Sequence, residues 1–155
     1  MTRAYFSLGS NLGDRGAHLR LGVAMMVHDE EFRVSRVYQS EPVGGVDQDD
    51  FWNLVLEVTT DATARDLLAR VRAAEAAAQR TREVRWGPRT LDVDIVWIDE
   101  VTCDDEDLTV PHPRLFERNF VVVPLRELRP DLVSEAHLAQ AHGALAPVGT
   151  LETLH

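Results

Sequence analysis

The sequence lacks the features that mark disulfide-bonded or membrane-spanning proteins. Cys103 is the single cysteine among 155 residues, so neither an intrachain disulfide nor a cysteine metal cluster can form. No apolar run approaches the roughly 18 to 20 residues that cross a bilayer, and the N-terminal residues MTRAYFSLGSN lack the apolar core of a signal peptide. We therefore expect a cytoplasmic protein with no membrane partner.

Basic side chains are scarce, and several of them are gathered in short segments. Lys and Arg number 16 against 26 Asp and Glu, which gives a formal net charge of −10. This balance argues against nucleic acid as a partner, because a chain that coats nucleic acid needs an excess of basic residues. The local clusters are Arg80, Arg82, Arg85 and Arg89, followed by Arg114 and Arg118. They suit a small anionic ligand, although a solvated basic loop would give the same pattern.

Hydrophobic periodicity predicts one domain over residues 1–155, without repeats or linkers. Strands are expected over residues 3–8, 32–40, 51–59 and 91–98, and helices over residues 14–28 and 64–79. Gly16 and Gly22 weaken the first helix, whereas Thr63 and Asp66 resemble a capping pair before the second. Residues 119–128 fit a strand or a helix equally, and residues 137–155 offer a short helix at most. The order of elements predicts an α+β fold, a ferredoxin-like sandwich whose antiparallel sheet has helices on one face and the active site on the other.

Two of the expected strands have one apolar face and one polar face. The apolar sets are Trp52, Leu54, Leu56 and Val58 in the first strand and Leu91, Val93, Ile95 and Trp97 in the second. Side chains alternate along a strand, so Asp92 and Asp94 share the opposite face of the second strand, as Phe51 and Asn53 do in the first. If both apolar faces pack on helices, these polar and aromatic side chains project together from the other side of the sheet.

Paired aspartates on a strand need an explanation, because Asp is depleted in strands. Residues two apart lie roughly 6.5 Å from each other along a strand, so ionised Asp92 and Asp94 repel unless one is protonated or a cation lies between them. A small number of oxygen ligands suits magnesium, which keeps several waters and accepts phosphate oxygens. The alternative is an ordinary solvated pair of aspartates.

The residues around these strands favour a phosphorylated ligand with a planar part. Arg89 follows the Gly87-Pro88 turn and lies three residues before Asp92. Its planar guanidinium matches phosphate oxygens and can neutralise charge that develops during phosphoryl transfer. Trp86 is either a cover for a planar ligand or a hydrophobic anchor for its loop. Asn53, close to the aromatic ring of Phe51, is either a reader of a lactam edge or a buried structural residue.

Four segments of the chain closely resemble the 6-hydroxymethyl-7,8-dihydropterin pyrophosphokinase family. They are SLGSNLGDR (7–15), YQSEPVGGVDQDDFWN (38–53), RWGPRTLDVDI (85–95) and LTVPHPRLFERNFVVVPL (108–125), in family order. The resemblance implies transfer of the diphosphoryl group of ATP to the hydroxymethyl oxygen of the pterin in folate biosynthesis. The products would be AMP and the pterin diphosphate.

The resemblance also implies a role for particular residues. Two Mg²⁺ ions would be held by Asp92 and Asp94, and Arg80, Arg89 and Asp94 would be the catalytic residues. The implied ATP contacts are Glu75, Arg82, Arg89, Ile95, Thr109, His112 and Arg118. The implied pterin contacts are Ser40, Pro42, Val43, Phe51, Asn53, Trp86 and Phe120, with Phe51 and Phe120 on the two sides of the ring. The resemblance favours a helix over residues 119–128, and without it His112 reads as a histidine of a turn.

The chain departs from the family pattern at a few positions. Gln79 replaces a more usual glycine before Arg80. The loop that carries Arg80, Arg82, Arg85 and Arg89 is of a shorter variety than in other members, which bears on the role of Arg82. Asp107 stands where some members carry a basic nucleotide contact, so that contact is missing or replaced.

Rival functions share the same expected fold. One is a noncatalytic module that binds a ligand or RNA, although Asp92 and Asp94 on the open face would repel RNA phosphates without metal. Another is a metal-dependent phosphohydrolase. The expected partners are ATP and the pterin, with no nucleic acid and no membrane, and we expect a monomer because nothing in the sequence demands an oligomer.

Overall fold

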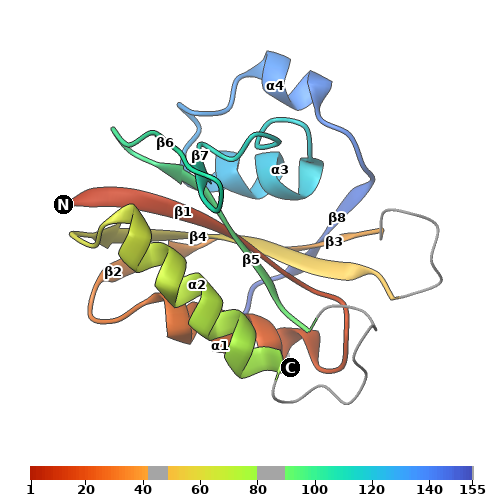
Figure 1. Cartoon of the computed structure of the whole chain (residues 1–155). Coiled ribbons are helices and arrows are strands. Elements are labelled where there is room, and N and C mark those ends of the chain that lie inside the picture. The colour runs from red at the N-terminus through yellow and green to blue at the C-terminus, as the bar shows by residue number, and fades with distance from the viewer. Residues whose placement is uncertain (42–48, 80–89, 155) are drawn as a thin grey trace.

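The computed structural model describes residues 1–41, 49–79 and 90–154 (Figure 1). The elements follow one another as β1 (Thr2–Ser10), α1 (Arg15–Met26), β2 (Glu31–Val34), β3 (Val37–Ser40), β4 (Phe51–Thr60), α2 (Ala64–Gln79), β5 (Asp92–Ile98), β6 (Cys103–Asp104), β7 (Thr109–Val110), α3 (Asn119–Leu128), α4 (Glu135–Gln140) and β8 (Leu145–Gly149). Among the described residues, no helix is long and apolar enough to span a membrane.

The main sheet is antiparallel and has the strand order β5-β1-β4-β3-β8. Strand β2 pairs with the same edge of β4 as β3 does, but with the later residues 56–59. Strands β6 and β7 form a separate hairpin. The single strand expected over residues 32–40 is divided between β2 and β3. Ser35 stands at the break, where its hydroxyl accepts the N–H of Val55 at 2.9 Å and its own N–H donates to the Val55 carbonyl at 3.0 Å. Helices with an antiparallel sheet confirm the expected α+β class.

Helices cover both faces of the sheet, so the expectation of helices on one face only is wrong (Figure 1). Helices α1 and α2 pack over one apolar cluster, whose members include Phe6, Leu8, Leu54, Leu56, Leu67 and Val71. Helix α3 packs over a second cluster on the opposite face, whose members include Tyr5, Val55, Val121, Val122 and Leu125. The apolar side chains of residues 119–128 need their own burial site, and the second face provides it.

The predicted sidedness of the strands is correct except at Trp97. Leu54, Leu56, Val93 and Ile95 all belong to the cluster under α1 and α2. In the pairing of β1 with β5, however, Phe6 faces Ile95 and Tyr5 faces Trp97, so the register shifts by one residue. This bulge turns Trp97 to the opposite face, where it packs against the second cluster.

Helix α1 forms over its predicted range despite its glycines. Asp14 caps it by accepting the N–H of Ala17 at 3.0 Å. A Cβ added at Gly22 would lie 2.7 Å from Leu8 Cδ2, so this glycine allows the helix to approach β1 closely. The capping pair predicted for α2 is also confirmed, because Thr63 and Asp66 exchange backbone-to-side-chain hydrogen bonds of 3.1 Å.

The C-terminal tail is more ordered than the sequence indicates. It contains α4 and then β8, which extends the main sheet by pairing with β3. Beyond β8, Leu151 and Leu154 pack against the first cluster, and Arg20 donates to the Leu151 carbonyl at 2.7 Å. The expectation of a short helix at most is therefore wrong.

Candidate active site

The sheet register brings the polar residues of neighbouring strands into rows. Gly9 on β1 is paired with Asp92 on β5 and with Asn53 on β4. Ser7, two residues earlier, is paired with Asp94 and Val55 in the same way. Asp94 is exposed and Asp92 is partly exposed. Because adjacent strands lie about 4.8 Å apart, the row places Asp92 and Asn53 roughly 10 Å from each other across Gly9.

Gly9 is a further candidate site residue, which the sequence pattern alone did not indicate. A Cβ at this position would lie 3.0 Å from Asn53 Oδ1 and 3.5 Å from Phe51 Cδ1. The absence of a side chain at Gly9 therefore allows Asn53 and Phe51 to lie this close to the backbone of β1. A glycine inside a strand often marks such a close approach, and this is the signal that could have identified it.

Asn53 is buried, and its hydrogen bonds fix the direction of its amide. Its Nδ2 group donates to Ser40 Oγ at 2.8 Å and to the Tyr38 carbonyl at 3.3 Å. Both amide hydrogens are thus used within the sheet. Oδ1 lies toward Gly9, so the structure shows Asn53 as a buried structural residue whose amide oxygen is directed at the backbone of β1.

The two predicted ring contacts lie on elements of this same sheet face. Phe51 begins β4 and is paired with Ser40, whereas Phe120 is the second residue of α3 and packs against the second cluster. The guanidinium carbon of Arg118 lies 5.5 Å from the centre of the Phe120 ring. The start of α3 thus carries both a cation and an aromatic ring.

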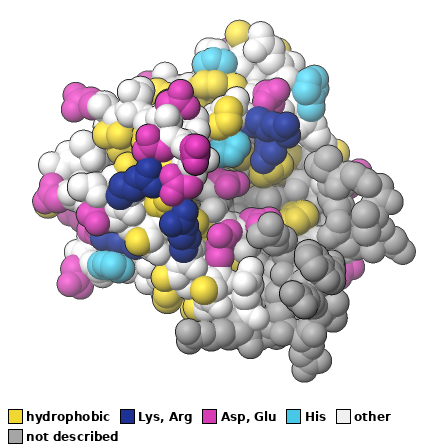
Figure 2. Space-filling model, in the orientation of Figure 1, with side chains coloured by type: hydrophobic (Ala, Val, Ile, Leu, Met, Phe, Trp, Pro, Cys, Tyr) yellow, Lys and Arg dark blue, Asp and Glu magenta, His cyan; other side chains and the backbone are white. Residues whose placement is uncertain are grey.

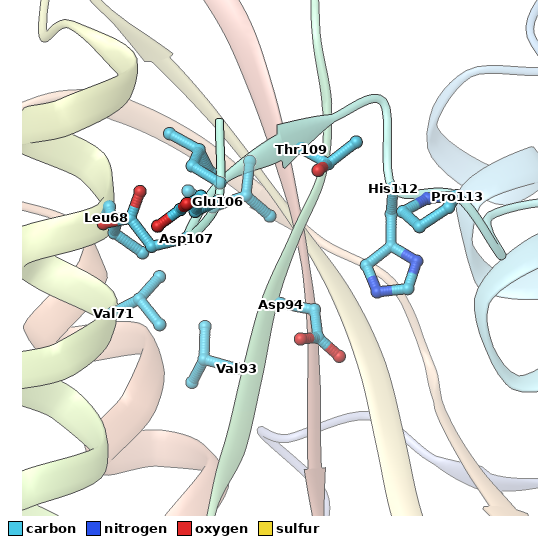
Figure 3. A pocket seen from close by; sticks show the side chains of 11 residues that line it. Leu68, Val71, Val93, Asp94, Glu106, Asp107, Thr109, His112 and Pro113 are labelled. Carbon is cyan, nitrogen blue, oxygen red and sulfur yellow. The ribbon is translucent and has the colours of Figure 1, made fainter. Parts of the chain in front are cut away.

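A pocket of about 280 Å³ lies beside β5, the terminal strand of the described sheet (Figure 3). Its lining comprises Leu68 and Val71 of α2, Val93, Asp94 and Ile95 of β5, and Glu106, Asp107, Leu108, Thr109, His112 and Pro113. The structure thereby brings together the predicted nucleotide residues Ile95, Thr109 and His112. Figure 3 shows Val71 and Val93 on the α2 side of β5, while Asp94 and His112 lie on its other side. The side chain of Ile95 is in the apolar core, so its backbone is the part that can contact a ligand.

His112 is a histidine of a turn, and its ring also lines the pocket. The backbone N–H of His112 donates to the Val96 carbonyl at 3.0 Å, and the ring Nδ1 accepts the backbone N–H of Arg114 at 3.1 Å, as expected of a histidine in a turn. Burial lowers the pKa of His112; the negative charge of Asp94 opposes this shift, and the positive charges of Arg118 and Arg114 reinforce it. Because Nδ1 accepts a hydrogen bond, the neutral ring carries its proton on Nε2, which can donate one hydrogen bond in the pocket.

Glu75, another predicted ATP contact, connects α2 to the aspartate strand. Its Oε2 accepts the N–H of Val93 at 3.1 Å, between Asp92 and Asp94. This bond holds the beginning of β5 against α2, so in the structure Glu75 positions the aspartate strand.

The unusual residue Asp107 is neutralised from α2. Arg65 donates to its two carboxylate oxygens at 2.8 and 2.9 Å, and Arg72 donates at 3.1 Å. Arg65 also pairs with Asp105, and Figure 2 shows basic and acidic side chains interleaved where α2 meets the β6–β7 hairpin. Positive charge near the pocket is therefore supplied by the helix.

The acidic residues fit magnesium better than a metal that needs a complete protein cage. Asp92 and Asp94 offer two carboxylates on one face of the strand, and no group of three or more His, Cys, Asp or Glu gathers among the described residues. Mg²⁺ accepts such a site because water and phosphate oxygens complete its coordination, whereas structural Zn²⁺ takes four protein ligands.

Several predicted site residues lie outside the described part of the chain. They are Pro42, Val43, Arg80, Arg82, Trp86 and Arg89. The described residues nevertheless define a class of site, in which a pocket with apolar and polar walls adjoins paired carboxylates. This combination is typical of enzymes that bind a nucleotide with a divalent metal.

Comparison with known proteins identifies the family. Residues 5–130 match the family described as 7,8-dihydro-6-hydroxymethylpterin-pyrophosphokinase. Three similar proteins are each named 2-amino-4-hydroxy-6-hydroxymethyldihydropteridine pyrophosphokinase. The Bacillus subtilis protein is 42% identical over 140 residues, covering 88% of this chain and 84% of the relative. The Methylorubrum extorquens protein is 43% identical over 136 residues, covering 86% of each, and the Mycobacterium bovis protein is 44% identical over 135 residues, covering 80% of this chain and 71% of the relative. The chain belongs to the 7,8-dihydro-6-hydroxymethylpterin-pyrophosphokinase family.

Proposed function

We propose that this protein transfers the diphosphoryl group of ATP to 6-hydroxymethyl-7,8-dihydropterin, giving AMP and the pterin diphosphate in folate biosynthesis. The observation that carries this proposal is the double position of Asp94. It lines the pocket, and it also lies on the sheet face that carries Asp92, Gly9 and Asn53. A nucleotide in the pocket and a pterin over Gly9 would therefore meet at the aspartates.

The pocket and the aspartates have separable tasks. Apolar side chains of α2 and β5 would enclose the adenine, and the backbone of Ile95 on the outer edge of β5 would contact its polar edge. Asp92 and Asp94 would hold two Mg²⁺ ions, which would neutralise phosphate charge in the reaction. In the reaction the hydroxymethyl oxygen bonds to the β-phosphorus, the bond to the α,β-bridging oxygen breaks, AMP leaves with that oxygen, and the hydroxyl proton is released.

The pterin residues would act mainly by orientation. Asn53 Oδ1 would accept an N–H of the ring, because both amide hydrogens are bound to Ser40 and Tyr38. Phe51 and Phe120 would enclose the ring from its two sides, and Trp86 would cover it, with backbone contacts from Ser40, Pro42 and Val43. Arg80, Arg82, Arg89 and Arg118 would neutralise the phosphates, with Arg80 and Arg89 acting on the charge that develops during transfer.

We also propose that the protein acts as a monomeric, cytoplasmic single domain spanning residues 1–155. The sheet face that carries Asp92 and Asp94 favours a small-molecule substrate over RNA, because these carboxylates would repel a bare phosphate backbone. Light scattering at micromolar concentration tests the monomer, and a stable dimer would contradict it.

The activity is tested by incubating the protein with magnesium, ATP and 6-hydroxymethyl-7,8-dihydropterin. AMP and pterin diphosphate in equal amounts are the expected products, whereas ADP or free phosphate from the nucleotide would indicate another reaction. Asp94→Asn should lower kcat by about 100-fold or more while the protein remains folded, because it weakens a metal ligand on an exposed face. Asp104→Asn, an exposed residue of β6, is the matched control and should retain full turnover.

A further inference from the structure

A short segment of the C-terminal tail, residues 142–145, contacts the beginning of α3. The N–H of His142 donates to the Glu117 carbonyl at 2.9 Å, and the N–H of Asn119 donates to the His142 carbonyl at 3.1 Å. The side-chain Nδ2 of Asn119 adds a hydrogen bond of 2.6 Å to the Gly143 carbonyl. These bonds hold the tail against the residues on either side of Arg118 and next to Phe120.

The same segment then joins the sheet beside Phe51. Leu145 is paired with Ser40, and Ser40 is paired with Phe51. Only three peptide units separate His142 from Leu145, so the attachments to α3 and to β3 lie within roughly 11 Å of each other. Residues 142–145 therefore connect the element that carries Phe120 to the row that carries Phe51.

The other end of α3 is fixed independently of the tail. The carboxylate of Glu127 accepts the N–H and the Nε of Arg36, each at 3.0 Å, and it also accepts the hydroxyl of Tyr38. Because this anchor holds the C-terminal half of the helix on β3, loosening the tail should displace mainly the N-terminal end. That end carries Arg118 and Phe120.

We propose that residues 142–145 form a clamp that sets the spacing between Phe120 and Phe51, with Asn119 and Gly143 as positioning residues for the pterin. This inference rests on the proposed function, which places the pterin between the two rings. The clamp should affect the pterin more than ATP, because the pocket is lined by α2, β5 and residues 106–113, and the described hydrogen bonds of residues 142–145 go instead to Glu117, Asn119 and β3. Arg118 also lies at the displaced end, but in the proposed site it is one of four arginines that neutralise the phosphates, so its displacement should change KM for ATP less than the displacement of Phe120 changes KM for the pterin.

Two substitutions loosen the clamp in different ways. Asn119→Asp keeps the size of the side chain but removes the donor to Gly143, and a negative charge at the start of α3 favours the helix itself. Gly143→Ala strains the backbone, because Gly143 has φ +111°, yet the added Cβ meets no atom within 4 Å. Each variant should raise KM for the pterin about three- to tenfold, with kcat and KM for ATP changed by less than about twofold.

Ser134→Ala is the control in the same tail. It removes the N-cap of α4, where Ser134 Oγ accepts the N–H of His137 at 3.1 Å, and it leaves residues 142–145 intact. It should lower Tm without changing KM for the pterin. The clamp is refuted if Asn119→Asp and Gly143→Ala leave KM for the pterin unchanged, or if they raise KM for the pterin and KM for ATP equally. It is also refuted if KM for the pterin changes only in proportion to the change in Tm. Wild-type protein that makes no AMP and pterin diphosphate would instead reject the proposed function.

Discussion

Gly9→Ala tests whether the pterin binds over Gly9, beside Asn53 and Phe51. The added Cβ would lie 3.0 Å from Asn53 Oδ1, about 0.4 Å closer than the 3.4 Å at which ordinary contact begins. Asn53 has little freedom to move away, because Ser40 Oγ and the Tyr38 carbonyl hold its Nδ2. The methyl group would therefore occupy the space between Asn53 and Phe51.

The expected effects on folding and on binding differ in size. A weakened hydrogen bond of Asn53 should lower the free energy of unfolding by about 0.5 to 1.5 kcal/mol. Replacing glycine within a strand should raise it by about 0.5 to 1 kcal/mol. The free energy of unfolding should therefore change by less than about 1 kcal/mol. An extra methyl in a fitted space costs about 1 to 3 kcal/mol, so KM for the pterin should rise about five- to 150-fold.

The assay compares KM for both substrates with urea unfolding of the same preparations. Gly16→Ala is the control, since Gly16 lies on α1 across the sheet and its nearest neighbour for a Cβ is the Nη1 atom of Arg20 at 3.3 Å. It should stabilise the helix and leave both KM values unchanged. A Gly9→Ala protein with normal stability and normal KM for the pterin would show that the ligand does not bind over Gly9.

Further predictions concern the core, an ion pair and the pocket rim. Gly22→Ala should lower the free energy of unfolding by about 1 to 2 kcal/mol in urea, because its Cβ would lie 2.7 Å from Leu8, and equal or higher stability would contradict the close approach. Burial alone would raise the pKa of Glu30, but hydrogen bonds from Arg70, Thr60 and the His28 N–H lower it from 4.5 to about 2. A carboxyl whose pKa is lower in the folded state stabilises the protein above pH 4.5, so between pH 4.5 and 2 the wild type should lose about 3 kcal/mol that Glu30→Gln does not lose. Urea unfolding across this pH range measures the difference, and parallel curves would refute the assignment. Asp107→Asn should remove one negative charge beside Arg65 and Arg72, although Arg65 keeps its pair with Asp105. It should lower KM for ATP about two- to threefold at low salt but not at 0.5 M salt, where screening removes the attraction. An unchanged KM at low salt would show that these arginines do not act on the nucleotide.

The parts of the fold that depend on local pattern could be predicted from the sequence. The alternation in β4 predicts that the side chains of Asn53 and Leu54 lie on opposite faces of the sheet. The burial of Val93 and Ile95 on one face of β5 likewise places Asp92 and Asp94 on the other. The capping pair of Thr63 and Asp66 set the beginning of α2. Each of these features is determined by residues close together in the chain.

The parts that depend on distant pairing could not be predicted in this way. Trp97 changes face because of a register shift against Tyr5 and Phe6, which lie far away in the sequence. Strand β8 contains Pro147 and Gly149, which locally indicate a loop, and it becomes a strand through its pairing with β3. The role of Gly9 follows from the positions of Asn53 and Phe51 on the neighbouring strand, so it required the sheet register.

Strand β8 also determines how the protein can be shortened. The family match ends at residue 130, and a chain cut there would leave the outer edge of Val37–Ser40 without its partner. An uncovered strand edge is a template for edge-to-edge self-association. In the intact protein Pro147 has no N–H to donate, which makes β8 a poorer template in its turn, so we expect the tail to oppose growth of the sheet from one molecule to the next.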